Sequence, residues 1–356
     1  MVEGQPDSTA HAGAVRALPQ ADQAMFAAVT GPPGACQRRA VAKTITLLES
    51  TRADHRARAD ALLNALLPAS GKSFRLGLSG VPGVGKSTFI EALGVHLIGL
   101  GHRVAVLTID PSSSVSGGSI LGDKTRMERL SMDTRAYIRP SPSSGTLGGV
   151  AEKTREAMRV CEAAGHDIVI VETVGVGQSE IAVAGMADMF VLMQLPNAGD
   201  DLQAIKKGVM ELADLVVINK ADLDEAAATR ARAQISSSLR LLGLHGKPEH
   251  PEHAPQHASA WQPQVMQLSA LKGTGLADFW AAVCRFRAVQ TANQGLAGRR
   301  HAQDQAWMWE RIDAGLKRGF KAHPGVKAAL PALTSDVRAG RVAASVAARR
   351  LLDLFI

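Results

Sequence analysis

The segment Gly80-Val81-Pro82-Gly83-Val84-Gly85-Lys86-Ser87 follows an apolar run at residues 74–79 and leads into a predicted helix that begins at Lys86. The stretch matches the pattern G-x-x-x-x-G-K-[ST] in the strand-to-helix context that the pattern requires. Glycines in such a loop allow backbone N–H groups to surround a phosphate, and the positive end of the helix dipole adds to the attraction. We therefore predict a phosphate-binding loop in which Lys86 bridges the β- and γ-phosphates of a nucleoside triphosphate and Ser87 binds Mg²⁺. Thr88 belongs to the same predicted set of nucleotide contacts.

A second motif predicts which base the bound nucleotide carries. Asn219-Lys220-Ala221-Asp222 follows an apolar run at residues 215–218. The Asp222 carboxylate can accept hydrogen bonds from N1–H and the exocyclic amine of guanine, and adenine has no matching pair of donors. We expect Asn219 to tie this segment to the phosphate loop and the Lys220 stem to cover the base. Ser269-Ala270-Leu271 is expected to contact guanine O6 through its backbone, so the sequence favours GTP and its product GDP over ATP.

The third motif, Glu172-Thr173-Val174-Gly175, stands at the end of an apolar run at residues 167–172. An acidic residue linked to Mg²⁺ and a glycine whose N–H contacts the γ-phosphate are expected at this place. Glu172 and Gly175 fit these two roles. Signalling GTPases follow this glycine with a glutamine that orients the attacking water, but here the next residue is Val176. We therefore expect slow intrinsic hydrolysis, or hydrolysis that residues brought in by a partner complete.

Two further acids flank a segment rich in Ser and Gly, residues 112–118. Asp110 ends the apolar run at residues 103–110, and Asp123 follows the segment. Such a composition is typical of a loop that becomes ordered around bound nucleotide and metal. Asp110 and Asp123 are therefore candidate ligands of the metal or of its waters, and the alternative for each is a capping role.

Apolar runs that alternate with helical segments predict the fold. The runs lie at residues 74–79, 103–110, 135–140, 167–172, 189–194, 215–220 and 264–269. Helices are predicted to begin at Lys86, near Asp201 and at Leu276, and to span about residues 150–163 and 225–242. This order, with continuously apolar strands, is typical of an α/β, doubly wound, mostly parallel sheet that helices cover on both faces. Ligands of such sheets bind at the carboxyl ends of the strands, where the motifs above fall.

Helices are also predicted on both sides of the phosphate-loop domain, which is expected at residues 73–290. Residues 1–72 are interpreted as an N-terminal helical extension that packs on this domain, and residues 291–356 as a C-terminal helical segment. We expect the C-terminal segment to break at His323-Pro324-Gly325 and to close with one amphipathic helix around residues 336–355. It carries a candidate apolar stripe made of Trp307, Trp309, Ile312, Leu316 and Phe320. The stripe either packs on its own domain or joins two subunits.

Composition disfavours several classes of protein. The hydrophobic fraction is 46%, enough for a large buried core, and the formal net charge of +7 is accompanied by only 4% aromatic residues. Scarce aromatics and the lack of a solid basic block argue against nucleic-acid binding. Cys36, Cys161 and Cys284 lie far apart, which fits a reducing compartment and disfavours a disulfide framework or a Cys-based zinc site. No signal-peptide pattern or membrane-length apolar stretch is evident, so we expect a cytoplasmic protein with no membrane partner.

A Pro- and His-rich stretch interrupts the sheet pattern at residues 245–262. Its histidines, His245, His250, His253 and His257, are irregularly spaced and no cysteine joins them. A solvated loop is therefore favoured over a metal site, and its role stays open.

The motifs, taken in order, resemble those of one family. The phosphate loop, ETVGVGQSE at residues 172–180, NKAD, SALKG at 269–273 and the string DPSSSVSGGSILGDKTRM at 110–127 are similar to the G-protein chaperones of adenosylcobalamin-dependent acyl-CoA mutases. This G3E-type family is typified by the methylmalonyl-CoA mutase-associated GTPase and was once described as a lysine/arginine/ornithine transport ATPase. The resemblance covers nearly the whole chain.

The resemblance implies a GTPase that gates delivery of adenosylcobalamin to the mutase, protects the mutase and helps to expel damaged cofactor. It also implies a homodimer joined by the C-terminal helices, contact with the adenosyltransferase that supplies the cofactor, and switch regions at residues 110–123, 172–180 and 196–208. In the third switch, Asp200, Gln203 and Lys206 are candidates for hydrolysis that depends on the partner. Asn197 stands there where the family usually has glycine.

Two other functions stay open at this point. A nickel-insertion GTPase shares this subclass of domain, and its mark would be a Cys/His cluster near the phosphate site. A transport-linked kinase would transfer the γ-phosphate to another molecule instead of releasing it. The client mutase is also open, because no residue discriminates methylmalonyl-CoA mutase from the isobutyryl-, ethylmalonyl- or 2-hydroxyisobutyryl-CoA enzymes.

Overall fold

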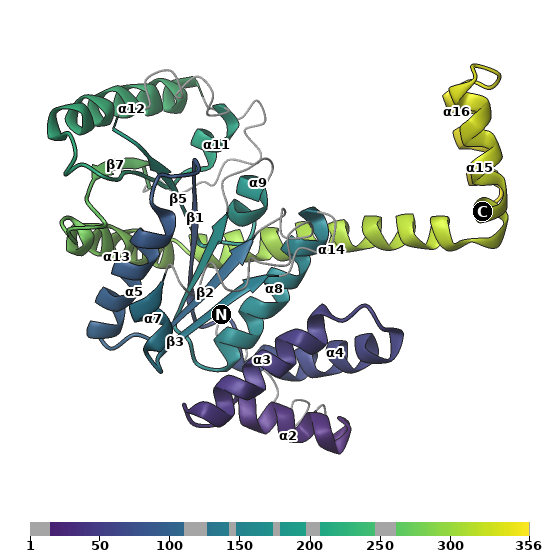
Figure 1. Ribbon diagram of the computed structural model, residues 1–356, viewed down its shortest axis with the longest axis horizontal. Coiled ribbons are helices and arrows are strands. Elements are labelled where there is room, and N and C mark those ends of the chain that lie inside the picture. Colours follow the sequence, from purple (N-terminus) through teal and green to yellow (C-terminus); the bar gives the residue numbers. More distant parts are fainter. Residues whose placement is uncertain are drawn as a thin grey trace. The chain divides into compact units, whose positions relative to one another are not determined.

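Seven strands form one sheet within the residues that this computed structural model describes, which are 15–109, 127–141, 147–173, 179–196, 207–245 and 261–355 (Figure 1). They are β1 (Phe74–Gly80), β2 (Val104–Ile109), β3 (Ala136–Ser141), β4 (Ile168–Thr173), β5 (Met189–Gln194), β6 (Leu215–Ile218) and β7 (Gln264–Gln267). Their order is β3-β2-β4-β1-β5-β6-β7, and each neighbouring pair is parallel. The predicted α/β fold is confirmed, because every predicted apolar run overlaps one of these strands.

Helices cover both faces of the sheet. One face packs against α5 (Lys86–Gly99), α7 (Glu128–Met132) and α13 (Leu276–Ala292), where the rings of Phe89 and Phe279 meet edge to face with centroids 5.0 Å apart. The other face packs against α8 (Leu147–Ala163), α9 (Ser179–Ala184), α11 (Lys207–Leu212) and α12 (Glu225–His245). Figure 1 shows α5 and α13 on one side of the strands and α8 and α9 on the other. A parallel sheet buried on both faces in this way explains why its strands are continuously apolar.

Among the described residues, the helices α2 (Gln20–Val29), α3 (Ala35–Glu49) and α4 (Ala53–Leu66) and the 3-10 helix η1 (Leu67–Ala69) precede the sheet. Their apolar side chains, among them Ile45 and Leu62, join the core on the face that α8 covers. Polar contacts add to this packing: Gln37 Nε2 donates to Ala164 O at 2.9 Å, and Arg139 Nη2 lies 2.6 Å from Glu49 Oε2. The predicted N-terminal helical extension is therefore present and continuous with the core of the sheet domain.

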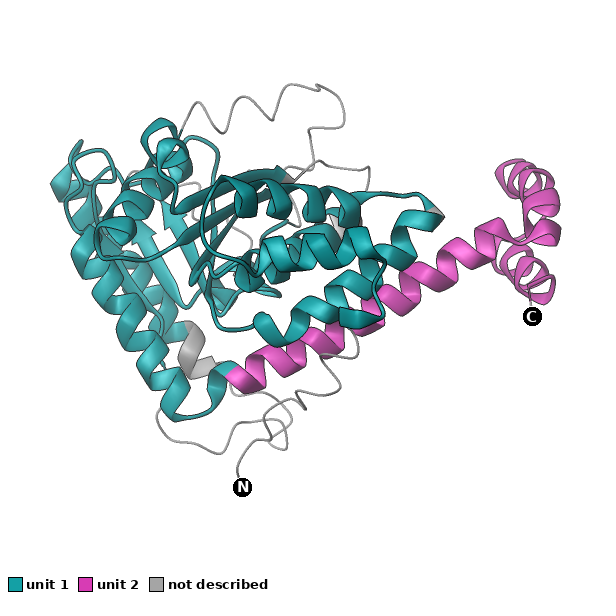
Figure 2. Cartoon of the chain, turned by 90° about the horizontal axis from the view of Figure 1, so that it is seen from below, with its two compact units in different colours: residues 1–296 teal, residues 297–356 magenta. Residues whose placement is uncertain are grey.

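The chain divides into two compact units, residues 1–296 and residues 297–356 (Figure 2). The three-domain division drawn from the sequence, at residues 72 and 290, stays a prediction. The second unit contains most of α14 (Gly295–Ala322), then α15 (Pro324–Arg338) and α16 (Ala344–Asp353). Within it, the ring of Phe320 packs edge to face on that of Phe355, with centroids 5.5 Å apart. None of the described helices is long and apolar enough to cross a membrane.

One expectation about the helices was wrong, and one helix was not predicted. The closing segment is not one helix over residues 336–355, because Gly340 takes a left-handed conformation with φ +70° and ends α15. The Arg341 N–H then donates to Asp336 O at 2.9 Å, a helix-ending bond that glycine permits without strain. The sequence pattern also gave no sign of α9, a six-residue helix between β4 and β5 that is too short to show a periodic apolar face.

Candidate functional site

The phosphate loop joins the end of β1 to the start of α5, in the centre of the sheet. Gly85 has a φ of +93°, a left-handed conformation that disfavours side chains. A Cβ at Gly85 would also lie only 2.7 Å from Asn219 Nδ2. Glycine at this position therefore does two things: it forms the turn into α5, and it lets the β6 end approach the loop.

Lys86 is the first residue of α5 and is only 8% exposed. Its Nζ donates to Gly80 O at 2.6 Å and to Val81 O at 3.3 Å, so the ammonium is held by carbonyls of the loop itself. Burial lowers the pKa of Lys86, and the charges of Glu172 and Glu180 act to raise it. The site thus places one buried cation beside carboxylates at the carboxyl edge of the sheet.

Glu172 is the penultimate residue of β4, at the position that pairs with Leu78 of β1, and it is 2% exposed. Its Oε1 accepts a hydrogen bond from Thr108 Oγ1 of β2 at 3.0 Å. The Ser87 hydroxyl follows Lys86 in the first turn of α5. Mg²⁺ takes oxygen ligands and commonly keeps waters and substrate phosphates alongside one or two protein groups. A serine hydroxyl and a buried carboxylate fit that donor set, and the described residues hold no group of three or more His, Cys, Asp or Glu placed as a metal cluster.

The Asn219 side chain connects three segments at this edge. Its Nδ2 donates to Val84 O of the phosphate loop at 2.8 Å, and its Oδ1 accepts from the Ala270 N–H at 3.0 Å. Lys220, with φ +61°, places its Nζ 2.8 Å from Gly83 O. The segments after β1, β6 and β7 are therefore locked together by side chains of the second motif.

These bonds border a pocket of about 270 Å³ beside the phosphate loop. Its lining residues are Gly85, Thr88, Asn219, Lys220, Asp222, Leu223, Ser269, Ala270 and Leu271. Asp222 is half-buried, and a hydrogen bond from the Ser269 side chain lowers the pKa of its carboxyl group and favours the ionised form. Leu223 and Leu271 are 75% and 80% exposed. An ionised carboxylate next to two apolar side chains is a pocket suited to a flat heteroaromatic base with hydrogen-bond donors on one edge.

The sequence reasoning missed Leu223 and Glu180. Leu223 directly follows the second motif, and this position could have predicted that it lines the pocket. Glu180 is half-buried in the first turn of α9, and its electrostatic effect on Lys86 was not predicted. Six predicted site residues lie outside the described residues: Asp110, Asp123, Gly175, Asp200, Gln203 and Lys206. The same holds for Val176, Asn197, His250, His253 and His257, while His245 is the last residue of α12.

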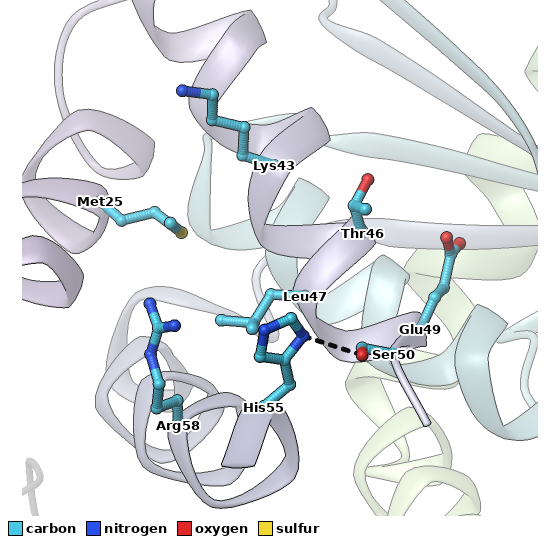
Figure 3. A pocket seen from close by; sticks show the side chains of 8 residues that line it. All are labelled: Met25, Lys43, Thr46, Leu47, Glu49, Ser50, His55 and Arg58. Atoms are coloured by element: carbon cyan, nitrogen blue, oxygen red, sulfur yellow. Dashed lines mark hydrogen bonds between the residues drawn. The ribbon is translucent and has the colours of Figure 1, made fainter. Parts of the chain in front are cut away.

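A second recess, of about 500 Å³, lies among the helices of the N-terminal extension (Figure 3). It is lined by Met25, Lys43, Thr46, Leu47, Glu49, Ser50, His55 and Arg58. Most of its polar groups already have partners: Arg58 pairs with the buried Asp22 at 2.7 Å, Glu49 with Arg139 at 2.6 Å, and the His55 ring with Ser50 Oγ at 2.8 Å. It lacks the glycine-rich loop and the base-reading carboxylate, so the pocket beside Lys86 is the candidate nucleotide site.

The family model described as methylmalonyl Co-A mutase-associated GTPase MeaB matches residues 41–324. The chain belongs to this family. A protein of Caulobacter vibrioides named as a GTPase is 54% identical over 318 residues, covering 89% of this chain and 94% of its own. The mouse (Mus musculus) protein named methylmalonic aciduria type A homolog, mitochondrial, is 46% identical over 330 residues, covering 90% of this chain and 77% of its own. A crystal structure of a protein named LAO/AO transport system kinase superposes with a TM-score of 0.69 at 33% identity, covering 98% and 99% of the two chains.

Proposed function

We propose that this chain binds GTP with Mg²⁺, hydrolyses it slowly to GDP and phosphate, and uses this cycle to gate adenosylcobalamin loading, protection and reactivation of an acyl-CoA mutase. The observation that carries the proposal is the pair of bonds through which Asn219 joins Val84 of the phosphate loop to Ala270 beside the base pocket. This link holds the base-reading carboxylate of Asp222 at a set place relative to Lys86. The family description, which names association with methylmalonyl-CoA mutase, supports the choice of partner.

The described residues suit each part of such a site. Lys86 exchanges the carbonyls of Gly80 and Val81 for the β- and γ-phosphates, and the nearby loop N–H groups hold the phosphate oxygens. Ser87 and Glu172 hold Mg²⁺, either directly or through a water, and the ion neutralises charge on the phosphates when it is bound. Asp222 accepts from N1–H and the amine of guanine, while Leu223 and Leu271 contact the ring.

Slow intrinsic hydrolysis follows from Val176, because valine cannot hydrogen bond an attacking water. In this proposal the mutase reorganises residues 196–208 so that Asp200, Gln203 or Lys206 completes the site. The adenosyltransferase that supplies the cofactor is a second proposed contact. The cycle then reports engagement of the mutase, because hydrolysis becomes fast only when the mutase is bound.

Adding the cognate mutase is expected to raise GTP turnover at least about tenfold, since residues supplied on partner binding stabilise charge in the transition state. Phosphate release is measured under saturating GTP, with the mutase in its apo and cofactor-loaded forms. The Lys86→Ala variant with mutase is the control for contaminating hydrolysis. If no cobalamin-dependent acyl-CoA mutase of the same organism raises turnover, the chaperone role is contradicted even though GTP binding stands. Transfer of the γ-phosphate to another molecule would instead favour a kinase.

The second unit supports a proposed homodimer. On α14, Met308, Trp309, Ile312 and Leu316 are 50%, 56%, 40% and 56% exposed. Ile312 follows Met308 by four residues and Trp309 by three, and Leu316 follows Ile312 by four, so all four share one side of the helix. A row of large apolar side chains in solvent is costly and is typical of a subunit interface. We propose that two copies of this helix cover each other's row around a two-fold axis.

The double variant Ile312→Glu, Leu316→Glu is expected to convert the dimer to a monomer, because burying two carboxylates in an apolar interface opposes association. Light scattering coupled to size exclusion measures the mass at micromolar concentration. Lys317→Glu is the matched control, since roughly 100° per residue turns position 317 away from the row. A monomeric wild-type protein, or a double variant that stays dimeric, would contradict this interface.

A further inference from the structure

Glu180 has a carboxylate oxygen that is hard to explain by the packing alone. Its Oε2 is buried and has no hydrogen-bond partner in the described part of the chain. Glu172, the other acid near Lys86, accepts a bond from Thr108. Buried carboxylates normally have partners, because desolvation of a charge is expensive when nothing replaces water. The negative charge of Glu180 is therefore not fully compensated by hydrogen bonds, and it can act on a cation nearby.

The packing of α9 places Glu180 beside the phosphate loop. A Cβ at Gly77 of β1 would lie 2.8 Å from both Val183 Cγ1 and Ala187 Cβ, so α9 rests directly on β1 at that level. Glu180 is three residues before Val183, hence on the same side of α9 and about 4.5 Å nearer its N-terminus. Since a strand rises about 3.3 Å per residue, this places Glu180 near Ser79 and Gly80, where β1 ends.

Lys86 is the cation at this place. Its Nζ donates to Gly80 O and Val81 O, at 2.6 and 3.3 Å, and no carboxylate lies within ion-pair distance of it in the described residues. Burial lowers the pKa of Lys86 and the charges of Glu172 and Glu180 raise it, so both acids act on the ammonium without contacting it. Lys86 is thus hydrogen-bonded to two carbonyls and is attracted by carboxylates that it does not contact.

Gln194 provides a second buried acceptor without a partner on this side of the loop. Met193 of β5 pairs with Gly80, so Gln194 aligns with Val81. Side chains alternate along a strand, and Leu192 belongs to the core on the α9 face, which places Gln194 on that face too. Gln194 is 1% exposed, and its Oε1 has no partner in the described residues. Glu180 and Gln194 therefore present two buried acceptors without donors beside Lys86.

We propose that Glu180 is a positioning residue that holds the Lys86 ammonium in the nucleotide-free loop and thereby weakens nucleotide binding and speeds nucleotide release. Phosphates that enter the loop draw Lys86 away from Gly80 O and Val81 O, and they bring negative charge toward the Glu180 carboxylate. Each effect opposes binding. Glu180 thus sets the lifetime of the bound state, and the inference rests on the proposed nucleotide site around Lys86.

The first test measures affinity and release. Glu180→Gln keeps the size of the side chain and removes its charge, so it is expected to bind a fluorescent GDP analogue about tenfold tighter and to release it about tenfold more slowly. Glu180→Asp keeps the charge and is expected to return both values toward those of the wild type. Glu211→Gln is the matched control, because Glu211 is an exposed acid on α11 of the same unit. Unchanged or weaker binding by Glu180→Gln overturns the proposal, because loss of a merely structural residue does not tighten binding.

The second test uses no nucleotide. The midpoint of urea unfolding is measured for wild type, Lys86→Met, Glu180→Gln and the double variant. If the two side chains attract each other in the free loop, Lys86→Met lowers the midpoint less in the Glu180→Gln background than in wild type. If the two substitutions shift the urea midpoint additively, the side chains are not coupled and the proposal is overturned. A chain that shows coupling but binds no guanine nucleotide contradicts the proposed function alone, so the two failures are distinguishable.

Discussion

Replacing Lys86 by alanine is expected to lower GTP affinity about 100-fold or more and to abolish measurable hydrolysis. The ammonium is the buried cation at the end of β1, and it is proposed to move from Gly80 O and Val81 O to the β- and γ-phosphates. Hydrogen bonds to charged groups contribute about 1.5–3 kcal/mol each, so loss of two corresponds to roughly 100-fold or more in affinity. Transition-state charge on the γ-phosphoryl group is then also less stabilised, and the rate falls further than the affinity.

Isothermal titration with a non-hydrolysable GTP analogue measures the affinity, and phosphate release measures the rate. Lys72→Ala is the matched control, because Lys72 is an exposed lysine just before β1 and its loss removes the same charge from the unit. Lys86 also bonds the free loop, so circular dichroism and the melting temperature of the variant are needed to show that the unit stays folded. A folded Lys86→Ala protein with normal turnover would contradict the assignment of the phosphate loop.

The sheet could be predicted because the requirement for each strand is met within a short stretch of sequence. A strand buried on both faces requires an apolar side chain at nearly every position, so β4 and β6 are visible as unbroken runs. The same holds for the phosphate loop and the guanine motif, whose glycines and side chains are close neighbours in sequence. In contrast, the end of α15 depends on one glycine, Gly340, that interrupts an otherwise continuous apolar periodicity. A periodic pattern alone does not show such a break.

The contacts within the site depend on residues far apart in the chain. Asn219 bonds Val84 and Ala270, and the partner of each bond is set by the order of β1, β6 and β7 in the sheet. The sequence motif predicted that Asn219 would reach the phosphate loop but carried no information about Ala270. Glu180 is a stronger example, since its place beside the phosphate loop depends on the packing of α9 on Gly77 of β1. Motifs therefore predict which chemistry is present, and the topology determines which charges face one another.

Asp222→Asn is expected to change the base that the protein prefers. The carboxylate has only acceptors, which match N1–H and the amine of guanine, whereas an asparagine side chain presents one acceptor and one donor. Xanthine keeps N1–H and has a carbonyl in place of the amine, so it matches asparagine. We expect affinity for GTP to fall roughly 1,000-fold relative to XTP, because a site built for one hydrogen-bond pattern leaves polar groups unpaired with the other base.

Competition of GTP and XTP for a fluorescent nucleotide measures this ratio for the wild type and the variant. Asp278→Asn is the matched control, since Asp278 is an exposed aspartate in the first turn of α13 and lies outside the pocket lining. The hydrogen bond from Ser269 lowers the pKa of the Asp222 carboxyl group, so the group stays ionised at neutral pH and has only acceptors. Asparagine cannot reproduce that state at any pH. A variant that still prefers GTP to XTP would show that another group reads the base, and the pocket between Leu223 and Leu271 would then be a stacking site without base specificity.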